Sequence, residues 1–180
     1  MSNAAAVPWP GPSPPFTRAD RMRVTVTVAL GLAVVVLSPR EPVPMLGHAD
    51  VPVAAVTAAL VRTAGLEIEQ EGRVLRHPGG FAMEVYWRCT GLLPAAFLAA
   101  LVVASPCPLR WRLAGAIVGG GLILVLNLSR LLVLFVVGVF RPEYFARAHD
   151  TWELIIVLSV PTAWLLWLNL GRQPGGTMDL

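Results

Sequence analysis

The sequence contains no lysine, since all 14 of its basic residues are arginine. No lysine nucleophile or lysine general base is therefore available, which excludes lysine-dependent hydrolases and phosphate-binding loops that require a lysine. Only 14% of the 180 residues are charged, whereas 56% are hydrophobic. Because a typical soluble domain has about 25% charged residues, this composition indicates an integral membrane protein.

The sequence also lacks the patterns of several other functional classes. No basic run is interleaved with aromatic residues, so the net charge of +3 does not indicate a nucleic-acid partner. The histidines have no i, i+4 or CxxC spacing, and we expect neither a metal site nor a cofactor. The apolar segments hold no paired aspartates and no Gly-x-Ser-x-Gly motif, which disfavours an intramembrane aspartyl or serine protease. No internal repeat is evident in the sequence, which disfavours a transporter.

Long apolar segments are abundant and predict an all-α membrane bundle of about four transmembrane helices. Arginines precede the first segment and no small-x-small cleavage site follows it, so we interpret it as an uncleaved anchor. The third segment would be roughly 42 Å long at about 1.5 Å per residue, so it must tilt, break or project from the bilayer. Pro161 predicts a kink in the fourth. The segments are residues 24–37, 90–104, 113–140 and 152–170.

The remaining segments complete the predicted organisation. Residues 1–17 contain five prolines and no apolar periodicity, which is typical of a disordered tail. Residues 18–172 form the membrane domain, and residues 173–180 form a second tail. The inner segments carry six arginines against two aspartates, and the long outer loop over residues 39–88 weighs little in the positive-inside rule. Both tails are therefore predicted to be cytoplasmic.

Two elements are predicted within the outer loop. Residues 51–66 are apolar, but they are short and are interrupted by Pro52 and Arg62, which favours a helix that lies in the membrane interface or packs on the bundle. Residues 66–70 alternate with a period of two, and Glu71-Gly72 offers a turn to a second strand. A small extracytoplasmic β-hairpin is therefore expected above the membrane.

Three reactive side chains lie at the outer ends of different apolar segments. Cys89 precedes the second segment, and His149 precedes the fourth. Arg130 lies 18 residues after Arg112, about 27 Å along a helix, which brings it to the same level. A thiol, a guanidinium and an imidazole can serve as nucleophile, oxyanion stabiliser and general base. The arrangement predicts acyl transfer at a membrane surface.

Each of these residues also has a structural interpretation. A membrane cysteine is usually a small buried residue, and Cys107, between two prolines on the predicted inner side, fits that role. Arg130 could extend its charge to the interface, and Asn127 could form a hydrogen bond between helices. His149 could be an ordinary interfacial residue. Since the two cysteines are predicted on opposite faces, we do not expect a disulfide between them.

The order of the motifs resembles the exosortase/archaeosortase family of membrane transpeptidases over about residues 20–170. The matching motifs are Cys89-Thr90-Gly91, Asn127-Leu128-Ser129-Arg130 and His149, and the short length is similar to the exosortase H group. The chain departs from the family's pattern at Arg88, where acidic or small residues are frequent. It departs again at Thr90, where serine is commoner. These departures concern substrate preference.

The resemblance implies a catalytic Cys89, Arg130 and His149, with Asn127, Thr90 and Gly91 in substrate-binding or supporting roles. It implies a bacterial inner-membrane enzyme whose site faces outward. Such an enzyme recognises a C-terminal sorting signal on exported proteins, cleaves it through a cysteine thioester and passes the substrate to an extracytoplasmic acceptor. The alternative is a non-catalytic structural or assembly subunit of a membrane complex, in which Cys89 would tolerate replacement.

Overall fold

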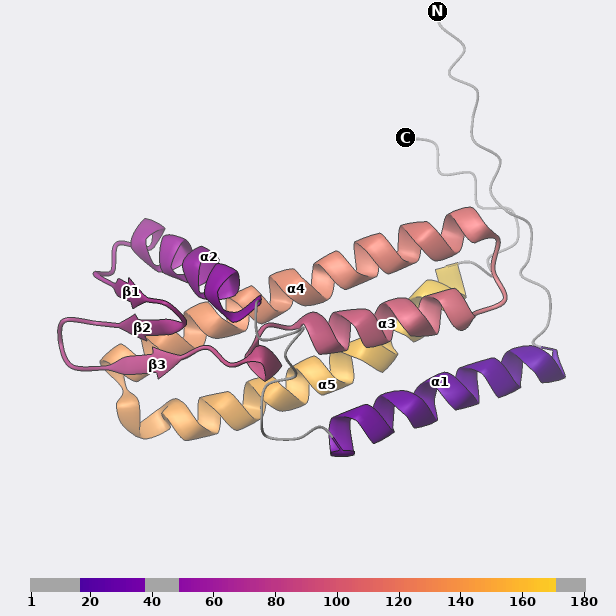
Figure 1. Ribbon diagram of the computed structural model, residues 1–180, viewed down its shortest axis with the longest axis horizontal. Coiled ribbons are helices and arrows are strands. Elements are labelled where there is room, and N and C mark those ends of the chain that lie inside the picture. The colour runs from indigo at the N-terminus through magenta and orange to yellow at the C-terminus, as the bar shows by residue number, and fades with distance from the viewer. Residues whose placement is uncertain (1–16, 38–48, 171–180) are drawn as a thin grey trace, which may run out of the picture.

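The computed structural model describes residues 17–37 and 49–170, and it forms a helical bundle with a small sheet at one end (Figure 1). Apart from Thr17, the predicted tails lie outside the described residues. The elements in chain order are α1 (Arg18–Leu37), α2 (Asp50–Thr63), β1 (Glu69–Glu71), β2 (Val74–Arg76), β3 (Ala82–Glu84), the 3-10 turn η2 (Trp87–Cys89), α3 (Leu92–Ala104), α4 (Leu109–Phe140), the 3-10 turn η3 (Pro142–Tyr144) and α5 (Phe145–Leu170).

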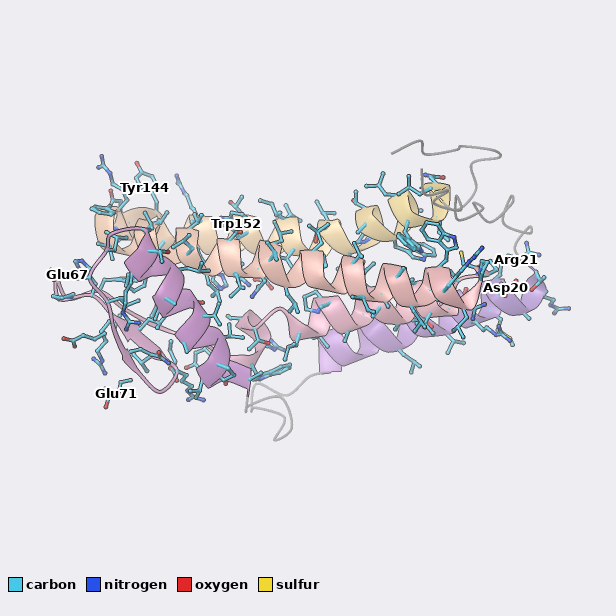
Figure 2. All side chains as sticks on the ribbon, turned by 90° about the horizontal axis from the view of Figure 1, so that it is seen from above. Asp20, Arg21, Glu67, Glu71, Tyr144 and Trp152 are labelled. Atoms are coloured by element: carbon cyan, nitrogen blue, oxygen red, sulfur yellow. The ribbon has the colours of Figure 1, made fainter. Side chains whose placement is uncertain are left out.

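Two of the described segments are long and apolar enough to cross a membrane, namely α4 and the stretch Pro142–Leu170 that contains α5. The apolar helix α3 has only 13 residues, and α1 begins with charged residues. The four predicted spans are therefore confirmed only in part. Figure 2 shows that labelled charged residues lie at both ends of the bundle, with Asp20 at one end and Glu71 at the other.

The helix α4 (Leu109–Phe140) is unusually long because its last turns extend past the bundle and pack against α2 and the sheet. The helix continues unbroken for 32 residues, about 48 Å at 1.5 Å per residue, so it projects beyond α3. Its projecting part carries Leu131, Leu134 and Phe135, which are buried against α2 and the sheet. α2 therefore packs on the bundle, and its Ala54, which has no exposed surface, belongs to the same core.

The predicted β-hairpin is present as β1 and β2, and a third strand that was not predicted extends it into a three-stranded sheet. β1 pairs with β2, and β2 pairs with β3, both antiparallel. Leu75 and Met83 are opposite each other in the register and turn into the core. The third strand is only three residues long and shows no apolar alternation beyond the buried Met83. Nothing in its sequence therefore distinguished it from a loop.

The loop before β3 is attached to the helices by Phe81. Its ring lies against Gly138 of α4, where a side chain of any size would overlap it. The same ring packs against Phe135 at 5.7 Å and Phe145 at 5.6 Å between ring centroids. Aromatic pairs at this separation stabilise a core beyond their buried area. Phe81 therefore joins the sheet to the adjoining ends of α4 and α5.

Candidate active site

Cys89 ends the turn η2, immediately before α3. Trp87 anchors this turn, since only 3% of its surface is exposed. The hydroxyl of Thr90 donates a hydrogen bond of 2.7 Å to the carbonyl oxygen of Trp87 and accepts one of 3.4 Å from the amide of Leu92. Thr90 is itself buried, so its hydroxyl holds the chain around the cysteine. Cys89 remains partly exposed.

Asn127 of α4 holds the same turn from the other side. Its side-chain amide donates a hydrogen bond of 2.6 Å to the carbonyl oxygen of Cys89, and Asn127 is 1% exposed. Gly91 allows this approach because its φ of +77° is in the left-handed region and because a Cβ there would lie 2.7 Å from Cβ of Asn127. The predicted helix-to-helix hydrogen bond of Asn127 therefore ends on the backbone of the candidate nucleophile.

We expect Gly91→Ala to lower both the thermal unfolding midpoint and the activity of the site. The left-handed conformation costs about 1–2 kcal/mol for a residue with a Cβ, and the methyl group also pushes Asn127 away. Gly65→Ala is the matched control, because Gly65 has a φ of +82° with nothing within 4 Å of the added atom. Gly65→Ala should lower the thermal unfolding midpoint but leave the activity unchanged. Equal stability losses and full activity in both variants would show that Asn127 does not hold Cys89.

Arg130 and His149 meet across the two long helices. The guanidinium of Arg130 donates a hydrogen bond of 3.1 Å from Nη2 to Nε2 of His149. Because arginine can only donate, Nε2 of His149 is the acceptor in this contact. Arg130 is 5% exposed, and its buried Nε has no hydrogen-bond partner in the described chain. The N–H at Nε is therefore a buried donor that no described residue binds.

His149 lies inside α5, whereas the sequence predicted it before the helix. The helix α5 begins at Phe145, so the polar residues that precede Trp152 are helical as well. The side chain of His149 is about one-third exposed, and its Nδ1 is 3.7 Å from a carboxylate oxygen of the exposed Asp150. Its helical position turns the imidazole toward α4 and the sheet, where Arg130 is located.

A cavity of about 260 Å³ brings the candidate residues to one surface. It lies between β3, α4 and the first turns of α5, at the end of the bundle that carries the sheet (Figure 1). Cys89 and His149 both line this cavity, while Arg130 lies behind His149. The other lining residues are Ala82, Met83, Glu84, Tyr86, Leu131, Leu134 and Phe145. Cys107, beyond the far end of α3, is not part of the site.

The sequence analysis missed an ionic network on the sheet side of this cavity. Glu84 binds Arg73 at 2.6 Å, and the guanidinium of Arg73 lies 5.3 Å from the ring centre of Tyr86. Hydrogen bonding from Tyr86, followed by the charge of Arg73, lowers the pKa of Glu84. Burial raises the pKa of Asp50, whose carboxylate is 4.0 Å from Arg73. Only the period-two spacing of Glu84 and Tyr86 before Cys89 could have indicated this network.

The side chains gathered around the cavity are those of a thiol, an imidazole and a guanidinium, which can serve as nucleophile, base and cation. Cys89, which is partly exposed, and His149 both line the cavity, and the buried guanidinium of Arg130 contacts the imidazole. A family model described as transmembrane exosortase matches residues 17–168 of the chain. The comparisons found no curated protein and no solved structure that matches the chain.

Proposed function

This chain belongs to the transmembrane exosortase family, whose model matches most of its length, and on that premise we propose that it is a cysteine-dependent membrane transpeptidase. The family is linked to the processing of sorting signals. The proposed substrates are exported proteins that carry a C-terminal sorting signal, made of a short motif, a transmembrane helix and a basic tail. Cys89 is the proposed nucleophile.

The observation that carries the proposal is the Arg130–His149 hydrogen bond behind the cavity that Cys89 lines. A buried arginine in an apolar helix costs several kcal/mol unless it is paired or hydrated. A single bond to a neutral imidazole, with Nε left over, satisfies this guanidinium incompletely. An unused donor held in a site of low dielectric is the kind of group that stabilises an oxyanion strongly.

The hydrogen bond also suggests an order of events. While Nε2 of His149 accepts from Arg130, its lone pair cannot take a proton from the thiol. When a substrate carbonyl oxygen arrives, Arg130 turns so that Nε and Nη2 both donate to it, and Nε2 of His149 becomes free. Nε2 then removes the proton from Sγ of Cys89, and the thiolate attacks the carbonyl carbon.

The tetrahedral intermediate collapses by breaking the C–N bond. The leaving amine takes the proton from His149, and the acyl group remains on Cys89 as a thioester. An acceptor amine or hydroxyl, or water, then attacks the thioester carbonyl and gives up its proton through His149. Cys89 leaves as the thiol and the cycle closes. The charge of Arg130 favours the thiolate as well as the oxyanion.

We place this reaction on the extracytoplasmic face of the inner membrane, with both termini in the cytoplasm. This orientation rests on the arginine-rich start of α1 and on Arg110 and Arg112 at the end of the bundle opposite the sheet. The acceptor is then an extracytoplasmic molecule, and the lipid bilayer holds the substrate's helix beside the enzyme. Nucleic acid has no part in the proposal.

A structural subunit is the second candidate, and the Asn127–Cys89 contact favours it. A hydrogen bond from one helix to the backbone at the start of another stabilises packing whether or not the thiol reacts. In that case the free Cys89 side chain would carry no function.

An impermeant maleimide applied to intact cells tests sidedness and the thiol together. We expect it to alkylate Cys89 and to stop processing of a candidate substrate, because Cys89 is partly exposed at the cavity. Cys107→Ser should be labelled and inhibited like the wild type, whereas Cys89→Ala should not be labelled unless the cells are permeabilised. Alkylation of Cys89 without loss of processing, or labelling of Cys107 in intact cells, would contradict the proposal.

A further inference from the structure

β3 is the edge strand of the sheet, and its open edge faces the cavity. Among the described residues no strand pairs with its outer side, since the sheet order is β1-β2-β3. The cavity is lined by Ala82, Met83 and Glu84, which are consecutive. Successive side chains of a strand point to opposite faces. A cavity that touches all three therefore runs along the edge of the strand and not over one face.

The register shows which backbone groups are unpaired at this edge. The amide of His77 bonds the carbonyl of Phe81, and the amide of Val85 bonds the carbonyl of Arg73. In an antiparallel ladder the bonds alternate, so residues 81, 83 and 85 point their backbone groups toward β2. Ala82 and Glu84 point theirs outward. In the described part of the chain these outward groups make no other main-chain bond.

We propose that the substrate segment next to the scissile bond binds in an extended conformation as a fourth strand on β3, with an apolar side chain in the cavity. The proposal rests on the function proposed above and assigns its binding mode. Strand addition to an exposed edge supplies main-chain hydrogen bonds, while pockets select alternate side chains. Because Cys89 and His149 line the same cavity, a peptide paired with Ala82 and Glu84 is delivered to the thiol.

The size and lining of the cavity favour this occupant. Ligand pockets for drug-sized molecules have about 300–1,000 Å³, and the cavity has about 260 Å³. It therefore accommodates a short stretch of peptide. Its helical lining includes, besides His149, the apolar side chains of Leu131, Leu134 and Phe145, which suit an apolar side chain of the substrate. Figure 1 shows β3 as the strand of the sheet nearest to the first half of α5, which bears Phe145 and His149.

Ala82→Pro tests the main-chain pairing. Proline removes an outward N–H and leaves the bonds to β2 in place, because edge strands tolerate proline where the N–H faces out of the sheet. We expect cleavage of a candidate substrate at limiting concentration to fall by about fivefold, which corresponds to the loss of one net hydrogen bond. Ala82→Val keeps the N–H and should cleave the substrate faster than the proline variant does.

Gln70→Pro is the matched control. Gln70 is opposite Leu75 in the register and points its backbone groups away from β2, on the outer edge of β1 far from the cavity. The variant should process substrate like the wild type. All variants are compared as full-length protein in membranes, with their amounts and thermal midpoints measured.

A second measurement varies the peptide. Synthetic peptides that cover the residues before the C-terminal helix of a candidate substrate are N-methylated at one backbone amide at a time. Strand pairing predicts that every second methyl group slows cleavage by the detergent-purified enzyme. The proposal fails if the sensitivity to N-methylation shows no period of two. It also fails if Ala82→Pro and Ala82→Val cleave the substrate at equal rates while cleavage still requires Cys89. Cleavage by Cys89→Ala would instead overturn the proposed function.

Discussion

Cys89→Ala should leave a candidate substrate uncut, with its C-terminal helix intact. No second thiol is available to the reaction, since Cys107 is buried beyond the opposite end of α3. Loss of the nucleophile removes the covalent intermediate, so processing should fall to the background of cells that lack the enzyme. The measurement is the mass of the substrate's C-terminal region, with the enzyme quantified in the membrane fraction.

Cys107→Ser is the control for this experiment. The substitution changes the other thiol without touching the cavity, and processing should stay at the wild-type level. Full processing by Cys89→Ala would end the transpeptidase proposal and leave the structural-subunit interpretation in place. A stable Cys89→Ala protein is expected, because Asn127 and Thr90 hold the turn through main-chain carbonyl oxygens and not through the thiol.

Arg130→Lys should reduce processing by about a hundredfold or more, the usual cost of losing an oxyanion donor. Lysine keeps the positive charge but replaces a planar group of five donors with a compact ammonium on a different stem. It cannot contact His149 and reach an oxyanion with the same geometry. The measurement is the rate of substrate processing at equal enzyme levels in the membrane.

Arg141→Lys provides the comparison. Arg141 caps the end of α4 with its side chain 73% exposed, so a lysine there should be silent. If Arg130→Lys also processed substrate at a near-normal rate, Arg130 would serve only to hold its helix at the interface. The Arg130 proposal would then be wrong even if Cys89 proved essential.

The helices were the easiest part of the fold to predict, because apolar runs reveal them. Residues 90–104 and 113–140 correspond to α3 and α4 within a few positions. The start of α5 was missed because residues 145–151 are mostly polar, and they are helical through their place at the bundle's end. The strand β3 was missed because its pairing depends on Arg73–Arg76 across a turn, which no local pattern encodes.

The sequence indicated the candidate site residues one by one, but it did not indicate the contacts between them. Hydropathy placed Cys89, Arg130 and His149 at one level, and the structure adds the Arg130–His149 contact at 3.1 Å. That Asn127 binds the backbone of Cys89 depends on the left-handed Gly91, which appears in the sequence only as another glycine. The Arg73–Glu84 pair requires the strand register and could not be read from composition.

The ring of Phe81 has a mechanical consequence for the site. It fills a socket over Gly138 and touches Phe135 and Phe145, so it links the loop before β3 to both long helices. The loop before β3 can move away from the helices only if this ring leaves its place over Gly138, which would expose apolar surface. Phe81 thereby fixes the position of β3 relative to the helices that carry Arg130 and His149. A rigid frame of this kind keeps reacting groups aligned before a substrate arrives, at the expense of adapting to substrates of different shape.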